Sequence, residues 1–291
     1  MIFCGRMKIC RYDGDRVGIV RDGAIFDATA ALEALPVRRW PYPAGDELIA
    51  SLDALAPSLE RAADGARPLD AASVRLDSPV ANPAKLIGAP VNYALHLDEA
   101  RSDRALHHDA PVHPIEKIGL FLKATSALVG PSAGVALRFP ERRTDHEVEL
   151  AVVIGRTADR VARADALRYV AGYAIGLDMT LRGPEERSYR KSIDSYAVLG
   201  PWLVTADEIP EPHALEIGLR VNGEERQRGS TGQMLFDVPR LIEQASAVYT
   251  LHPGDVLFTG TPAGVGAVTP GDRLEAWIER IGTMTVEIRA A

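Results

Sequence analysis

Residues 144–154 read TDHEVELAVVI, two alternating glutamates followed directly by an unbroken apolar run. Side chains of a β-strand alternate between its two faces, so Glu147 and Glu149 point to the same side. The apolar run after them predicts a buried strand. Two unpaired buried carboxylates are costly, and a bound divalent cation offsets that cost. The stretch therefore predicts a β-rich core with a metal site at one strand end; the alternative is an edge strand with a solvated acidic face.

A third carboxylate stands at the end of another apolar strand, predicted over residues 173–177. This residue is Asp178. Ligation by oxygen atoms alone favours Mg²⁺, Mn²⁺ or Ca²⁺ over zinc. We therefore expect Glu147, Glu149 and Asp178 to hold one divalent ion, with Mg²⁺ or Mn²⁺ as the first choices and Ca²⁺ as the third.

The pattern around this stretch predicts a mainly β protein with some α-helix. From residue 85 onward, short apolar strands alternate with Gly and Pro, and Asn222-Gly223 marks a hairpin turn. The first eighty residues differ, with short strands, turn signals at Asp13-Gly14 and two helix candidates separated by prolines. We expect a small N-terminal α+β domain over residues 1–80 and a larger β-rich domain over residues 81–291.

Composition excludes several classes of protein. The chain has 291 residues, of which 46% are hydrophobic and 25% charged, as in ordinary globular proteins. A formal net charge of −7 argues against a nucleic-acid binder. No apolar stretch approaches the length of a membrane span. Cys4 and Cys10 have no metal-binding spacing, so we expect free thiols and a cytoplasmic protein without nucleic-acid or membrane partners.

A histidine and a glutamate three residues apart suggest a general base. On a helix His96 and Glu99 share a face, and a carboxylate beside an imidazole orients it and raises its basicity. The alternative is an exposed ion pair on a helix. Residues 101–114, which follow, are polar and have little periodicity, so we expect a long loop that closes over the site.

Two of the five lysines and a Gly-rich segment supply further polar groups. Lys123 follows an apolar strand, where an ammonium suits the stabilisation of an oxyanion; Lys191 precedes Ser192. The segment 259–266 (TGTPAGVG) offers the Thr261 hydroxyl and backbone N–H groups to an anion. Surface lysines and a plain turn are the alternatives. The absence of a G-x-S-x-G elbow and of a G-x-G-x-x-G fingerprint argues against a serine hydrolase and a dinucleotide dehydrogenase.

The order of these motifs resembles the fumarylacetoacetate hydrolase family, in its acylpyruvase-like branch, over roughly residues 85–290. The matching segments are N-Y-x-x-H-x-x-E at 92–99, FLK at 121–123, DHEVEL at 145–150, LDMT at 177–180, KS at 191–192, LGPW at 199–202, LHPGD at 251–255, TGTPAGVG at 259–266 and PGD at 270–272.

The resemblance implies a mixed β-sandwich roll like the C-terminal domain of that family, and a homodimer. It assigns metal binding to Glu147, Glu149 and Asp178, and water activation to His96 and Glu99. It assigns Lys123 to catalysis, and Lys191, Thr261 and Arg182 to the substrate.

The activity that the resemblance implies is metal-dependent hydrolysis of a C–C bond in a small 2-oxo acid such as an acylpyruvate. A 2-oxo acid decarboxylase or isomerase of a catabolic pathway, and a non-catalytic metal-dependent carboxylate binder, are the alternatives. The His96–Glu99 pair argues against the binder, because binding alone needs no base.

Overall fold

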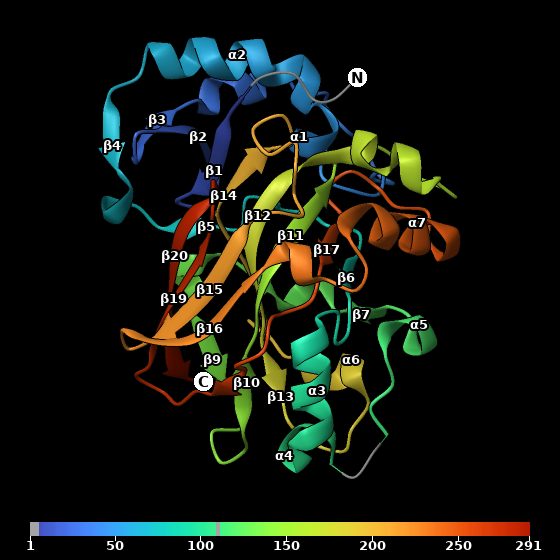
Figure 1. The fold of residues 1–291 in the computed structure, drawn as a ribbon. Coiled ribbons are helices and arrows are strands. Elements are labelled where there is room, and N and C mark those ends of the chain that lie inside the picture. Colours follow the sequence, from blue (N-terminus) through green and yellow to red (C-terminus); the bar gives the residue numbers. More distant parts are fainter. Residues whose placement is uncertain (1–5, 109–110) are drawn as a thin grey trace.

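The computed structural model describes residues 6–108 and 111–291, which form one large sheet, two smaller sheets and several short helices (Figure 1). The predicted class, mainly β with some α, is confirmed. The large sheet has the strand order β4 (Pro68–Asp70), β3 (Ala24–Asp27), β2 (Arg16–Arg21), β1 (Lys8–Tyr12), β14 (Ala197–Thr205), β12 (Val170–Asp178), β11 (Val148–Ile154), β17 (Val256–Phe258), β6 (Leu86–Gly88) and β7 (Phe121–Lys123), with β5 (Leu76–Asp77) on β1 and β8 (Leu128–Val129) on β14.

Strand β11 is buried on both faces, which explains its unbroken apolar run. Leu150 and Val152 belong to one apolar core, and Ala151 and Val153 to another, as the period of two in a strand requires. The core around Leu150 also contains side chains of one of the two smaller sheets. The core around Ala151 contains side chains of α2 (Leu52–Asp64). The central strands are therefore enclosed by a sheet on one side and a helix on the other.

The second sheet packs against the first and forms the sandwich. A hairpin at one edge of it turns at Asn222 and Gly223, both with positive φ, as the Asn-Gly signal predicted. A three-stranded sheet adjoins the start of β11. The second sheet has the order β16 (Glu224–Ser230), β15 (Glu216–Val221), β19 (Arg273–Ile278), β20 (Gly282–Ala290) and β9 (Val135–Leu137); the third has the order β13 (Thr180–Leu181), β10 (Thr144–His146) and β18 (Gly266–Ala267).

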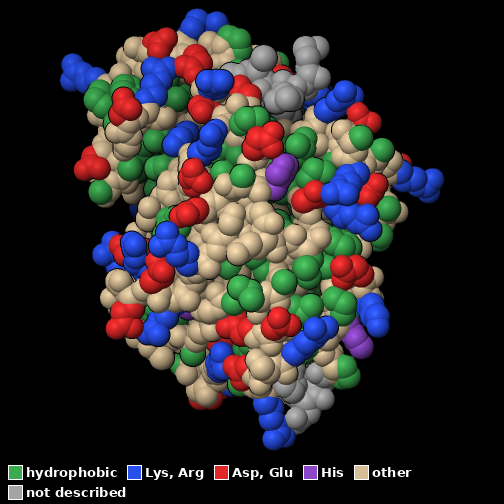
Figure 2. Space-filling model, in the orientation of Figure 1, with side chains coloured by type: hydrophobic (Ala, Val, Ile, Leu, Met, Phe, Trp, Pro, Cys, Tyr) green, Lys and Arg blue, Asp and Glu red, His purple; other side chains and the backbone are tan. Residues whose placement is uncertain are grey.

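The helices are short and lie at the ends and on the faces of the sheets (Figure 1). In the described ranges no helix is long and apolar enough to cross a bilayer. On the face in Figure 2, acidic and basic side chains are interspersed. The remaining helices are α1 (Glu47–Ala50), α3 (Ala94–Ser102), α4 (Arg104–His107), α5 (Ile115–Ile118), α6 (Arg187–Lys191) and α7 (Val238–Val248), with 3₁₀ turns at Thr29–Ala34, Ala71–Ser73, Thr125–Ala127, Pro131–Ala133, Arg163–Tyr169 and Thr231–Gln233.

The expectation of one long loop over residues 101–114 is wrong for its first part. Helix α3 continues to Ser102, and α4 starts directly after Asp103. The carboxylate of Asp103 accepts a hydrogen bond from the backbone N–H of Ala105 at 2.8 Å and thereby caps the new helix. Asp109 and Ala110 of this segment lie outside the described residues.

The first eighty residues join the large sheet. Strand β1 pairs antiparallel with β14, with Lys8 opposite Val204. Side chains of α2 share an apolar core with β11 and β17. The division into two domains at residue 80 stays a prediction.

Candidate active site and metal centre

Three carboxylates converge where β11 begins and β12 ends. Val148 and Leu177 are direct partners across this antiparallel pair, so Glu147, Glu149 and Asp178 come from neighbouring positions of one sheet. One oxygen from each lies within 4.8 Å of the others, and all three side chains are buried. The same-face prediction for the two glutamates therefore leads to a convergent set of oxygen donors, the kind that Mg²⁺ and Mn²⁺ prefer.

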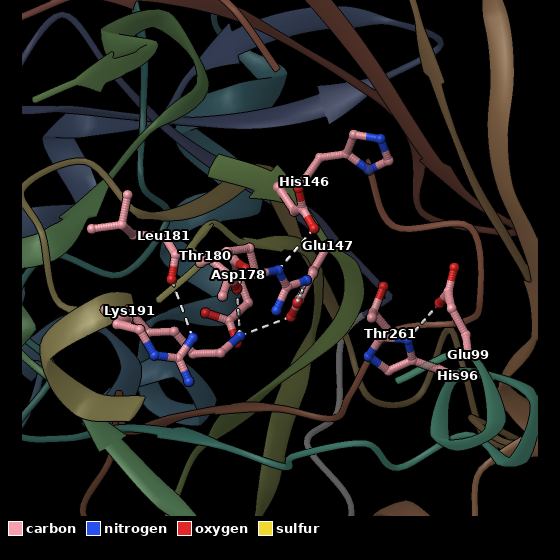
Figure 3. A network of polar contacts seen from close by, with 12 residues as sticks. His96, Glu99, His146, Glu147, Asp178, Thr180, Leu181, Lys191 and Thr261 are labelled. Atoms are coloured by element: carbon pink, nitrogen blue, oxygen red, sulfur yellow. Dashed lines mark hydrogen bonds and ion pairs between the residues drawn. The ribbon is translucent and has the colours of Figure 1, made fainter. Parts of the chain in front are cut away.

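Two lysines contact this carboxylate group. The Lys191 ammonium donates to Glu147 Oε2 at 2.8 Å and to Asp178 Oδ2 at 2.6 Å (Figure 3). Lys123, at the end of β7, contacts the other Asp178 oxygen and donates to the Tyr196 carbonyl at 2.8 Å. Burial, together with the neighbouring Lys191 charge, lowers the pKa of Lys123, although Asp178 opposes this shift. Both lysines are therefore part of the buried site and are not surface residues.

Glu147 and Glu149 differ in their electrostatic surroundings. Burial alone would raise the pKa of Glu147, but the charges of Lys191 and Arg182 hold it well below its usual range. Burial and the nearby charges of Asp178 and Glu147 raise the pKa of Glu149 well above its usual range. The Glu149 carboxylate accepts a hydrogen bond from the backbone N–H of Gly260 at 2.7 Å. A divalent cation among the three carboxylates would supply the positive charge that favours ionised Glu149, so the donor set fits a metal ion.

Arg182 lies against carboxylates. Its Nε donates to Asp145 Oδ2 and its Nη2 to Glu147 Oε1, both at 2.8 Å. The guanidinium therefore ties β13 to β10 and orients Glu147. Asp145 was not among the residues predicted for the site; its position two residues before Glu147 was the available signal.

The predicted histidine–glutamate pair forms on α3. His96 Nδ1 lies 2.8 Å from Glu99 Oε2, and Glu99 Oε1 accepts from the backbone N–H of Gly264 at 3.0 Å. A proton on Nδ1 satisfies the carboxylate and leaves Nε2 able to accept another proton. His96 is buried and lines the same cavity as the three carboxylates, and Figure 3 shows its ring on the side of Glu99 that faces Glu147.

Thr261 is fixed by a glutamine that sequence reasoning missed. The Thr261 hydroxyl donates to the Val148 carbonyl at 2.7 Å and accepts from Gln227 Nε2 at 2.7 Å. Gln227 Oε1 lies 2.9 Å from His146 Nδ1 and accepts from the backbone N–H of Val148. Gln227 is completely buried although its strand, EERQRGS, is otherwise polar and gave no sign of it. It links the second sheet to the strand that carries the glutamates.

These groups surround one cavity of about 160 Å³. The carboxylates, His96 and Thr261 lie on its walls, together with the apolar Phe121 and Ile118. Cationic side chains from α6 and from the segment that precedes it also line the cavity, namely Arg182, Arg187, Arg190 and Lys191. The cavity therefore combines an acidic, metal-suited end with an imidazole and a cationic wall.

Comparison with known proteins agrees with this geometry. The family profile of the fumarylacetoacetate (FAA) hydrolase C-terminal domain matches residues 85–289. The chain is 54% identical, over 98% of its length and all of the relative's, to a maleylpyruvate hydrolase of Aquipseudomonas alcaligenes.

Solved structures show the same similarity. A maleylpyruvate hydrolase from Sphingobium sp. SYK-6, in complex with manganese(II) and pyruvate, superposes with a TM-score of 0.83 at 39% identity and covers 98% of this chain and 100% of its own. A fumarylacetoacetate hydrolase from Exiguobacterium antarcticum gives a TM-score of 0.75 at 31% identity, with 98% and 100% coverage.

The chain belongs to the fumarylacetoacetate hydrolase family, in its acylpyruvase-like branch. It is a metal-dependent hydrolase that cleaves a C–C bond in a small 2-oxo acid. The predicted family, fold and reaction class are confirmed.

Proposed function

We propose that the enzyme hydrolyses maleylpyruvate to maleate and pyruvate. The observation that carries this proposal is the cluster of Glu147, Glu149 and Asp178 beside the His96–Glu99 pair in one cavity. The identity to a maleylpyruvate hydrolase extends over nearly all of both chains, which supports the choice of substrate. Maleylpyruvate is an acylpyruvate whose acyl group ends in a second carboxylate.

We assign Glu147, Glu149 and Asp178 to one divalent cation, Mg²⁺ or Mn²⁺, with Ca²⁺ as the third choice. When bound, the cation supplies a Lewis acid for the carboxylate and 2-oxo oxygens of the pyruvate half. Lys191 and Arg182 hold Glu147 ionised and oriented toward the cavity. The three ligands therefore have a fixed geometry before the cation arrives.

His96 acts as the general base. Its Nε2 takes a proton from a water that attacks the acyl carbonyl, while Glu99 stabilises the resulting imidazolium. The bond between the acyl carbon and the methylene of the pyruvate half then breaks, and its electron pair stays with pyruvate as the enolate. The imidazolium returns the proton to that carbon. The new carboxyl group of the acyl half loses the remaining water proton to solvent, so water and maleylpyruvate give maleate, pyruvate and one proton.

Lys123, Lys191, Thr261 and Arg182 complete the assignment. Lys123 is completely buried against Asp178 and is not among the described residues that line the cavity, so we assign it to the positioning of Asp178 rather than to contact with the substrate. Lys191, Thr261 and Arg182 form the wall against which the pyruvate half binds, and each is already held by a hydrogen bond to its neighbours. A fixed wall needs little reorganisation when the substrate arrives.

Product identification tests this function. Purified enzyme with Mn²⁺ and maleylpyruvate is expected to release pyruvate and maleate in equal amounts. Carbon dioxide in place of maleate would support the decarboxylase, an isomeric 2-oxo acid would support the isomerase, and binding without product would support the carboxylate binder. Each of these three results contradicts the proposal.

We also propose that the enzyme is a cytoplasmic homodimer with a catalytic domain over residues 81–291 and a smaller domain over residues 1–80. The family resemblance supports the dimer. Sedimentation equilibrium is expected to give twice the chain mass; a single-chain mass at micromolar concentration would contradict it.

A further inference from the structure

Two arginines of α6 line the catalytic cavity without a role in the reaction described above. Arg187 and Arg190 are three residues apart, so they lie on the same side of the short helix. Both are half-buried and both line the cavity that holds the three carboxylates. Their neighbours in this wall, Arg182 and Lys191, donate to Glu147, whereas these two do not.

Arg190 is anchored by backbone carbonyls. Its Nε donates to the Glu185 carbonyl at 2.8 Å and its Nη1 to the Leu181 carbonyl at 3.1 Å. These bonds fix the guanidinium but leave its charge without a carboxylate at ion-pair distance among the described residues.

Arg187 is supported by an aromatic ring. Its Cζ lies 5.6 Å from the centre of the Phe121 ring, a cation–π distance. Within residues 6–108 and 111–291, no carboxylate forms an ion pair with it. A half-buried guanidinium that faces a cavity and lacks a carboxylate is costly unless an anion enters.

The two arginines also repel one another. Burial lowers the pKa of both guanidinium groups, and the charges of Arg182 and Arg187 lower that of Arg190 further. Positive charge is therefore concentrated on the α6 wall of the cavity. A ligand anion would relieve this repulsion.

We propose that Arg187, with Arg190 beside it, forms a second carboxylate subsite that receives the far carboxylate of a dicarboxylic acylpyruvate. This inference rests on the proposed function, in which the pyruvate half occupies the acidic end of the cavity. The planar guanidinium pairs with a carboxylate through two parallel hydrogen bonds, which gives direction as well as charge. Specificity arises because a monocarboxylic acylpyruvate leaves the guanidinium unpaired.

The test compares two substrates that share the reacting half. Maleylpyruvate has the far carboxylate, and acetylpyruvate ends in a methyl group. In Arg187→Gln, the ratio of kcat/KM for maleylpyruvate to that for acetylpyruvate is expected to fall about 10- to 100-fold, as for the loss of one charge-assisted hydrogen-bond pair. Arg187→Lys keeps the charge but loses the two parallel hydrogen-bond donors of the guanidinium. Its substrate ratio is therefore expected to lie between those of the wild type and Arg187→Gln.

Arg138→Gln is the matched control. Arg138 is exposed, pairs with Asp194 and does not line the cavity, so this variant removes one positive charge without touching the subsite. Its substrate ratio is expected to equal that of the wild type. A ratio in Arg187→Gln equal to that of the wild type would overturn the subsite. Failure of the wild type to release pyruvate from maleylpyruvate would instead overturn the proposed function, so the two failures are distinguishable.

Discussion

The imidazole of His96 and the carboxylate of Glu99 lie 2.8 Å apart on one face of α3, and Gly264 holds the second Glu99 oxygen from a distant loop. The base is therefore oriented by two separate parts of the chain. Its ring stands at the wall of a cavity whose other wall carries three convergent carboxylates. This relationship separates water activation from metal binding, and the first two predictions make use of that separation.

Removal of the base should slow turnover without loss of the metal. In His96→Ala, kcat is expected to fall by roughly 10²–10⁴, the usual contribution of general-base catalysis. Binding of oxalate to the Mn²⁺-loaded protein, measured by calorimetry, should persist, because chelation depends on the cation. The control His213→Ala removes a half-exposed histidine elsewhere and should match the wild type. Near-full activity in His96→Ala would contradict the hydrolytic mechanism.

Replacement of a metal ligand should impair both metal binding and turnover. Glu149→Gln keeps the shape of the side chain but loses the carboxylate that accepts a hydrogen bond from the backbone N–H of Gly260. Weaker Mn²⁺ binding and loss of pyruvate release are expected together, since a cation needs the charge of this ligand. Glu33→Gln, at an exposed position, is the control. Wild-type Mn²⁺ affinity in Glu149→Gln would exclude Glu149 as a ligand.

The close packing of the central sheet should make Gly172 irreplaceable. A Cβ at Gly172 would lie 2.2 Å from the Val204 carbonyl oxygen on β14, a backbone atom that cannot turn aside. Gly172→Ala is expected to lower the free energy of unfolding by about 3 kcal/mol. In the control Gly65→Ala the nearest atom is 3.7 Å away, so urea denaturation should show no loss of stability. Equal stability of the two variants would contradict the described packing.

The Cys10 thiol should be inert in the folded protein. Burial raises its pKa to about 12 from an ordinary value of 9.0. In a Cys4→Ser background, a thiol reagent at pH 8 should label Cys10 only after denaturation. Above pH 9 the unfolded thiol ionises while the folded one keeps its proton, so this group should make stability fall as pH rises. Rapid labelling of the folded protein would contradict its burial.

The site was more predictable than the fold around it. Glu147, Glu149 and His96–Glu99 are spaced by the periods of a strand and a helix, so local geometry alone placed them on common faces. Asp178 and Lys191 were separate signals. The pairing of β11 with β12 brings Asp178 to the glutamates, and the position of α6 brings Lys191 to Glu147. Gln227 could not be predicted, because its burial depends on the packing of one sheet on another and its strand is otherwise polar.

The polar segment over residues 101–114 shows where the sequence-based prediction was wrong. Its weak periodicity predicted a loop, yet Asp103 caps a further helical turn. A capping residue acts over three residues, so its effect is too local for a test of periodicity to detect. The pairing of β1 with β14 was equally hidden, because strand partners far apart in sequence leave no local mark.

The most direct test of the central claim, that the three carboxylates hold one divalent ion required for C–C hydrolysis, is Mn²⁺ titration of the chelator-treated enzyme with pyruvate release as the readout. We predict no pyruvate without metal and full activity at one Mn²⁺ per chain in the wild type. Glu149→Gln should stay inactive at that ratio, and His96→Ala should bind one Mn²⁺ with little turnover. Pyruvate release at the wild-type rate from metal-free enzyme, or from Glu149→Gln at one Mn²⁺ per chain, would contradict the claim.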